Sequence, residues 1–347
     1  MTHPQRCLYK SSFTNQSLKA PTLRVGLDTL RIVNGACDMG QKINTSRFYY
    51  QWKGHDIPDI SAFRFTAHSL RPSKPIIYLA GDSSLDNKYW VPSSGPAGEP
   101  LLVDVPDIYR ATLDRPQPKP DIAFWLNHLV GDQATAINLA VEASTLRERE
   151  EGLLDQDSFI RDNICAEDIL VVSIGGNDIA LKPTFATVHH MLQLAWLTPR
   201  KCLQRGTAWS LSHFTNIFKD QVQVYISKLV EKQKPRVVIV CMIYYPLEAT
   251  ASKQTSWADI ALKILGYNRF PGQLQAAIKS MYESSTKHIE IPGVMVVPCP
   301  LFEAMDGKNE ADYTARVEPS TEGGRKIAVQ LKEIIDSLAI IVPEEQT

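Results

Sequence analysis

The 347-residue chain lacks the features that mark several classes of protein. Its six cysteines are far apart and include no C-x-x-C pair, so we expect free thiols rather than a disulfide framework or a zinc site. Lysine and arginine are scattered, and the formal net charge is −1, so the sequence shows no cluster of basic residues that would bind nucleic acid. No apolar run approaches the roughly 18–20 residues that span a bilayer.

Motifs for metals and phosphates are also missing. The sequence has no H-E-x-x-H motif and no G-K-[ST] after its glycine pairs. His189 and His190 are adjacent, so on a helix they would point about 100° apart rather than toward one ion. We expect a small-molecule substrate as the partner, neither nucleic acid nor membrane, and no cofactor or metal. The sequence predicts no oligomeric state.

The first residues do not resemble a secretion signal, because MTHPQRCLYKSSFTNQ is polar throughout and has no apolar core. With no membrane span and no disulfide pattern, the expected location is the cytoplasm.

Five short apolar runs are rich in β-branched residues and nearly continuous in hydrophobicity, which is typical of strands buried on both faces. Helix-like stretches lie between them, and this alternation predicts a flavodoxin-like, three-layer α/β/α domain with a doubly wound parallel sheet. The expected strands are Pro75–Ala80, Thr135–Leu139, Asp168–Ile174, Arg236–Ile243 and Gly293–Pro298. The expected helices are Asp121–Val130, Leu146–Ile164, Trp209–Lys234, Gln273–His288 and Glu322–Leu338.

Near the N-terminus, LRVGLDTLRIVNGA resembles one or two short strands, and YYQWKGHDIPDISAFRF carries aromatic residues with no helical period. We therefore expect residues 1–70 to form an N-terminal extension packed on a main domain of residues 71–347. That domain contains two insertions, at about 91–120 and 181–215. Both begin at the ends of strands and could form the walls of a pocket. The first is rich in proline, which favours an extended loop rather than a helix.

Polar residues follow the expected strands at the sheet edge where ligands bind in this class of fold. Gly81-Asp82-Ser83 follows the first strand, and Gly175-Gly176-Asn177-Asp178 follows the third. These blocks, in this order, resemble the SGNH (GDSL-type) hydrolase superfamily, and the resemblance covers about residues 75–335. It implies a serine nucleophile at Ser83 and an oxyanion hole made by the Ser83 N–H, the Asn177 amide and a backbone N–H at Ala143, where the family has glycine. Further site candidates are Asp82, Gly176, Asp178 and Arg316.

Elementary chemistry agrees with these roles. Ser83 at the N-terminus of a helix would have backbone N–H groups and the helix dipole beside a developing oxyanion. Asn177 on a glycine-permitted turn could aim its amide at the same oxygen. Each residue also has a plainer explanation, since serine, aspartate and asparagine cap helices and form turns. The two blocks in register favour the functional interpretation.

The last block departs from the superfamily pattern. The usual Asp-x-x-His-Pro is replaced by Ala315-Arg316-Val317-Glu318-Pro319, and no histidine follows His288. Glutamate, with an ordinary pKa of ~4.3, is a weak base for a hydroxyl unless burial raises its pKa by about two units. An adjacent Arg316 would work against that shift. Other groups that could serve Ser83 are His128, His189, His190 and Cys299.

The sequence therefore predicts an enzyme that acts on an ester- or acyl-bearing small molecule, with Ser83 as nucleophile and Glu318 in the place of the usual histidine. Two alternatives stay open. One is a non-hydrolytic enzyme (an isomerase, cyclase or transferase) that reuses the oxyanion pocket and a carboxylate. The other is a catalytically inactive pseudo-hydrolase that only binds a ligand.

Overall fold

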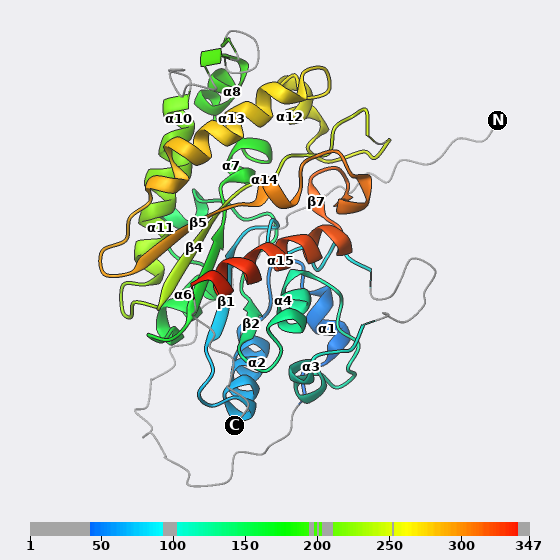
Figure 1. The fold of residues 1–347 in the computed structure, drawn as a ribbon, viewed down its shortest axis with the longest axis vertical. Coiled ribbons are helices and arrows are strands. Elements are labelled where there is room, and N and C mark those ends of the chain that lie inside the picture. The colour runs from blue at the N-terminus through cyan, green and yellow to red at the C-terminus, as the bar shows by residue number, and fades with distance from the viewer. Residues whose placement is uncertain are drawn as a thin grey trace, which may run out of the picture. The chain divides into compact units, whose positions relative to one another are not determined.

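A five-stranded parallel sheet in the order β2-β1-β3-β4-β5 forms the centre of the computed structural model (Figure 1). The strands are β1 (Ile76–Gly81), β2 (Thr135–Asn138), β3 (Ile169–Ser173), β4 (Val237–Met242) and β5 (Met295–Pro300). Each overlaps one of the five expected runs, and the side chains of β1, β3 and β4 are buried from both faces.

The structure describes residues 42–92, 103–193, 198–199, 201–202, 211–251 and 253–338. All of them fall in one unit, Lys42–Thr347. The short strands expected near residues 22–35 lie outside the described residues, and so does part of each expected insertion.

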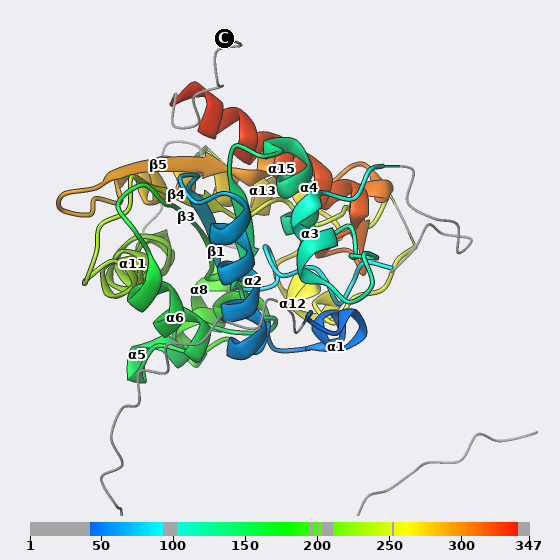
Figure 2. The ribbon, with the colours of Figure 1, turned by 90° about the horizontal axis from the view of Figure 1, so that it is seen from below.

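Helices cover both faces of the sheet (Figure 2). One layer contains α4 (Ile122–Val130) and α15 (Thr321–Ser337), which pack against each other. The opposite layer contains α2 (Ile57–Leu70), α6 (Asp155–Asn163) and α11 (Val222–Leu229). This confirms the three-layer α/β/α fold that the resemblance to SGNH hydrolases implies.

The remaining elements are mostly short. The helices are α1 (Thr45–Tyr50), α3 (Asp107–Thr112), α5 (Glu148–Glu151), α7 (Gly176–Ala180), α8 (Phe185–Leu192), α10 (Leu211–Thr215), the π-helical η2 (Asn216–Gln221), α12 (Asp259–Ile264), α13 (Pro271–Ser284), the 3₁₀ turns η3 (Thr286–His288) and η4 (Glu310–Asp312), and α14 (Leu301–Ala304). The strands β6 (Tyr313–Thr314) and β7 (Glu318–Pro319) form a separate antiparallel pair.

Three expectations about helices were wrong. Residues 45–70 contain α1 and α2, and α2 buries Ile60, Phe63 and Ala67 at helical spacing. The window had shown no period because it spans the break between the two helices. The proline-rich insertion contains α3, which begins directly after Pro106, a position that proline tolerates. The helix expected at 146–164 is interrupted by Gly152, whose backbone is fully extended.

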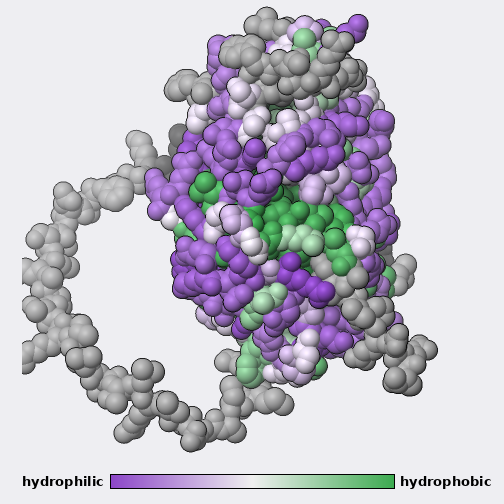
Figure 3. All heavy atoms as spheres, turned by 60° about the vertical axis from the view of Figure 1, so that its left-hand side comes forward, coloured by the Kyte–Doolittle hydropathy of each residue, from purple (hydrophilic) through white to green (hydrophobic). Residues whose placement is uncertain are grey.

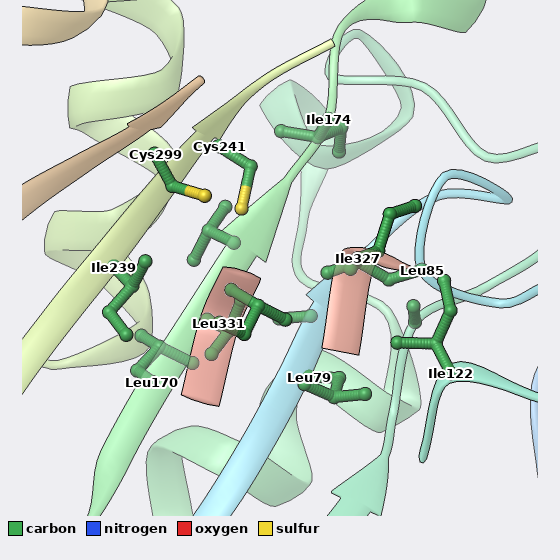
Figure 4. Packing of buried hydrophobic residues seen from close by; sticks show 14 of the residues in the cluster. Leu79, Leu85, Ile122, Leu170, Ile174, Ile239, Cys241, Cys299, Ile327 and Leu331 are labelled. Atoms are coloured by element: carbon green, nitrogen blue, oxygen red, sulfur yellow. The ribbon is translucent and has the colours of Figure 1, made fainter. Parts of the chain in front are cut away.

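The core is one continuous cluster between the sheet and its helices. Figure 4 shows Ile327 and Leu331 of α15 among side chains from three strands, including Leu79, Leu170 and Ile239. All five are fully buried. A side chain of this size contributes about 1.5–3 kcal/mol when it is removed from water, so this layer holds the strand ends in place.

The edge strand β5 is the least covered part of the sheet. Met295 is 56% exposed, whereas β1, β3 and β4 are buried along their whole length. Figure 3 brings the β5 side of the molecule forward and shows apolar side chains gathered between polar regions. Among the described residues, no helix is long and apolar enough to cross a membrane.

Candidate active site

The turn after β1 carries Ser83. A Cβ on Gly81 would lie 1.8 Å from the carbonyl oxygen of Ser173, so only glycine fits where β1 passes β3. Asp82 then anchors the turn: its N–H donates to Ser173 O at 3.0 Å, and its carboxylate accepts the Ser84 N–H at 3.0 Å. The expected helix after Ser83 does not form, because the chain makes successive turns up to residue 91. The helix-dipole argument for Ser83 was therefore wrong.

The turn after β3 carries Asn177. Gly175 has φ +110°, a backbone conformation that suits glycine, and α7 begins at the next residue. The Asn177 amide donates to the carbonyl oxygen of Ser144 at 3.0 Å. That bond uses one of its two amide hydrogens and fixes the side chain. Asn177 and Ser83 line the same pocket, so the structure brings these two predicted residues together.

Ala143 has φ +59°, a left-handed backbone conformation that favours glycine. Its loop is tied to the end of β1, because Val141 N–H and the Ser144 hydroxyl both donate to the Gly81 carbonyl oxygen, at 3.0 and 3.1 Å. Neither Ala143 N–H nor Ser83 N–H donates a hydrogen bond to any described residue. Two backbone donors thus have no partner among the described residues, and unused donors of this kind are what an oxyanion hole requires. Ala143 itself is not among the residues that line the pocket.

Glu318 lies on β7 with its side chain in the same pocket as Ser83. The carboxyl is 1% exposed, and its Oε1 accepts the Trp257 indole N–H at 2.9 Å. Its Oε2 is buried and has no hydrogen-bond partner within the described part of the chain. Burial raises the pKa of Glu318 to about 7, although the Trp257 N–H and the nearby Ser83 hydroxyl lower it. This is the upward shift that a glutamate base needs near neutral pH.

Arg316 does not act on Glu318. Its guanidinium forms an ion pair with Asp259 at 2.7 Å and donates to Asn268 and to the Leu247 carbonyl oxygen. The expectation that it lowers the pKa of Glu318 was wrong, because the arginine faces α12 instead. Arg316 also has φ +66°, so this strained residue fastens the turn before Glu318 to the α12 region.

Further buried carboxyls surround the two key side chains. Glu142 accepts the Trp90 indole N–H at 3.4 Å and leaves its Oε2 buried without a partner in the described residues. Burial and the charges of Glu318 and Asp86 raise the pKa of Glu142 to about 9, and burial raises that of Asp82 to about 6. Within this group, Asp86 alone has an ion-pair partner among the described residues, at 2.6 Å from Lys88. Unpaired buried carboxylates are costly, so Glu142 retains its proton at neutral pH.

The remaining candidates from the turns, Asp82, Gly176 and Asp178, differ in whether they line the pocket. Asp82 and Gly176 line the pocket. Asp178 accepts Leu146 N–H at 2.9 Å and Arg147 N–H at 3.3 Å, so it holds the loop after Ala143 rather than facing substrate.

The histidines and Cys299 do not meet Ser83. His190 stacks on His213 with ring centroids 4.7 Å apart, and His128 stacks on Phe124 at 6.3 Å. Cys299 is buried beside Cys241 under the sheet helices. No histidine among the described residues lines the pocket, and the carboxyl groups that line it belong to Asp82 and Glu318.

The pocket is apolar apart from its end at Ser83 and encloses about 800 Å³, counting its open mouth. Its lining comprises Asp82, Ser83, Ser84, Gly176, Asn177, Ile179, Ala180, Ile243, Tyr244, Pro246, Trp257, Ala258, Ala261, Leu262, Leu265, Leu274, Ile278, Met281, Val317 and Glu318. In the described residues, no group of three or more His, Cys, Asp or Glu side chains could hold a metal ion.

Sequence reasoning missed Glu142 and Trp257. Glu142 follows the second strand within four residues, so the rule that located Ser83 could also have found it. Trp257 comes from a loop far along the chain, and only the fold brings it to Glu318.

No family model and no curated protein matches the chain. Among solved structures it is similar to phospholipase A1 from Streptomyces albidoflavus, with 12% identity, TM-score 0.39 and coverage of 75% of this chain and 99% of that one. It is also similar to a carbohydrate esterase family 3 protein from Talaromyces cellulolyticus (12%, TM-score 0.37, 78% and 100%) and to the M. smegmatis aryl esterase (13%, TM-score 0.37, 77% and 100%). Because identity is this low, the chemistry of this chain must be argued from its own residues.

Proposed function

We propose that this chain is an SGNH-like serine hydrolase of ester- or acyl-bearing small molecules, in which a buried glutamate replaces the usual histidine. One observation carries the proposal. Ser83 and Glu318 line the same pocket, and burial brings the pKa of Glu318 to about 7, within the range in which histidine works.

The reaction needs only groups already described. The Glu318 carboxylate takes the proton of the Ser83 hydroxyl while Oγ attacks the carbonyl carbon of the ester. The resulting oxyanion accepts hydrogen bonds from the Ser83 and Ala143 N–H groups and from the second amide hydrogen of Asn177. As the C–O bond breaks, the leaving alkoxide takes the proton from Glu318. Water then repeats the sequence on the acyl-serine and restores both side chains.

The test is labelling by a fluorophosphonate probe, together with turnover of a short acyl ester. We expect the wild-type protein to react and Ser83→Ala to lose both labelling and turnover. Ser84→Ala is a control for labelling, because the neighbouring serine is held by Asp82 and Ser173 through its hydroxyl. Equal turnover by Ser83→Ala would overturn the nucleophile assignment.

The non-hydrolytic alternative predicts a different ranking of the activity losses in the Ser83 and Glu318 variants. An enzyme that enolises or cyclises its substrate with a carboxylate would suffer far more from Glu318→Gln than from Ser83→Ala. A binding protein without activity would show a ligand-dependent rise in melting temperature and no product. The cytoplasmic location stays a prediction from the sequence.

A further inference from the structure

The wall of the pocket beyond Ser83 comes from a helical pair between β4 and β5. From the α12 region the pocket is lined by Ala258, Ala261, Leu262 and Leu265, which follow the i, i+3, i+4, i+7 spacing of one helix face. Helix α13 adds Leu274, Ile278 and Met281, which share a face in the same way. Two apolar stripes therefore line one cavity.

Polarity in the pocket is confined to the end at Ser83. There Ser83, Asn177 and Glu318 supply the reactive groups, and the Tyr244 hydroxyl is already engaged with the Val317 carbonyl oxygen at 2.7 Å. Trp257 marks the boundary, since its indole N–H holds Glu318 while the residue also lines the pocket. Beyond it, the side chains of the α12 region and α13 that line the pocket offer neither charge nor hydrogen bonds.

We propose that this cavity binds the acyl half of the substrate and that the acyl group is an unbranched aliphatic chain; the inference rests on the proposed hydrolase function. The walls are aliphatic, and the alanines at 258 and 261 leave room between larger neighbours. The acyl half stays on Ser83 until water arrives, whereas the alcohol half must leave. We therefore place the acyl half in the apolar pocket and the alcohol half at the open mouth.

The first experiment measures kcat/KM for p-nitrophenyl esters from acetyl to dodecanoyl. We expect an increase of about fourfold per methylene until the cavity is full, corresponding to ~0.8 kcal/mol for each buried CH₂. Ala261→Phe fills the cavity and should lower the octanoyl-to-acetyl ratio at least about tenfold. Ile260→Phe is the matched control: it adds a similar ring on the outer side of the same helix, where Ile260 is 76% exposed, and should leave the ratio unchanged.

The second experiment separates this inference from the hydrolase proposal. Octanoate binding to Ser83→Ala is measured by calorimetry, with and without Ala261→Phe, and melting temperatures confirm that each variant folds. If the wild-type protein shows no turnover of any ester, while Ser83→Ala binds octanoate and Ala261→Phe weakens that binding, the pocket is supported and the hydrolase is rejected. Turnover that is indifferent to acyl length and to Ala261→Phe would overturn the inference. So would a chain-length preference that follows the alcohol in a series of alkyl acetates.

Discussion

The indole N–H of Trp257 donates to Oε1 of Glu318 at 2.9 Å, so a residue from the loop before α12 holds the carboxyl that faces Ser83. The bond fixes one oxygen of Glu318 and leaves the other without a partner in the described residues. The histidine of a serine triad is oriented by a carboxylate; the base proposed here is itself a carboxylate, and an N–H donor orients it. The hydrogen-bond roles are therefore exchanged: Glu318 accepts a bond from the residue that orients it, whereas a triad histidine donates one.

Trp257→Phe should move the pH dependence of turnover to higher pH. The Trp257 hydrogen bond stabilises the ionised form of Glu318 and lowers its pKa. Without that bond the pKa rises, and a base that must be ionised becomes active only at higher pH, by about one unit. The measurement is kcat/KM between pH 5 and 9. An acid limb that stays in place while activity falls uniformly would mean that Trp257 only shapes the pocket.

Glu318→Gln should reduce kcat by about 10²–10⁴-fold, because glutamine keeps the shape of the side chain but cannot accept the serine proton. In the wild-type protein, kcat/KM should rise with pH through about 7, where Glu318 ionises. Glu318→His offers a base with an ordinary pKa of ~6.5 and should recover more activity than glutamine does. If Glu318→Gln keeps the wild-type kcat, Glu318 is not the base.

Glu142→Gln should stabilise the protein at neutral and alkaline pH. The folded-state pKa of Glu142 is about 9, above its value in the unfolded chain, so the folded protein keeps a proton that the unfolded chain releases. The free energy of unfolding therefore falls by up to about 1.4 kcal/mol per pH unit between ~4.5 and about 9, and glutamine removes this loss. Denaturant unfolding at pH 5, 7 and 9 measures it. The exposed Glu290→Gln is the control, and a stability curve that keeps its slope in Glu142→Gln would contradict the expectation.

The sheet and the position of Ser83 were predictable because they depend on local patterns. Strands buried on both faces appear as continuous β-branched runs, and the strand ends then locate Ser83 and Asn177. The surroundings of Glu318 were not predictable. The partner of Arg316 is Asp259, fifty-seven positions away, and that of Glu318 is Trp257, sixty-one away. No local pattern encodes such pairings, and an adjacent arginine in sequence is a poor guide to an adjacent charge in space.

Ala143→Gly should stabilise the fold and preserve turnover. Ala143 has φ +59°, a left-handed conformation that costs a residue with a Cβ roughly 1–2 kcal/mol. Glycine relieves that strain but increases the freedom of the unfolded chain, so we expect a net gain of up to about 1 kcal/mol in the free energy of unfolding. Ala140→Gly, at a buried alanine whose φ is not positive, is the matched control and should destabilise. If Ala143→Gly destabilises as much as the control does, the left-handed turn is not a source of strain.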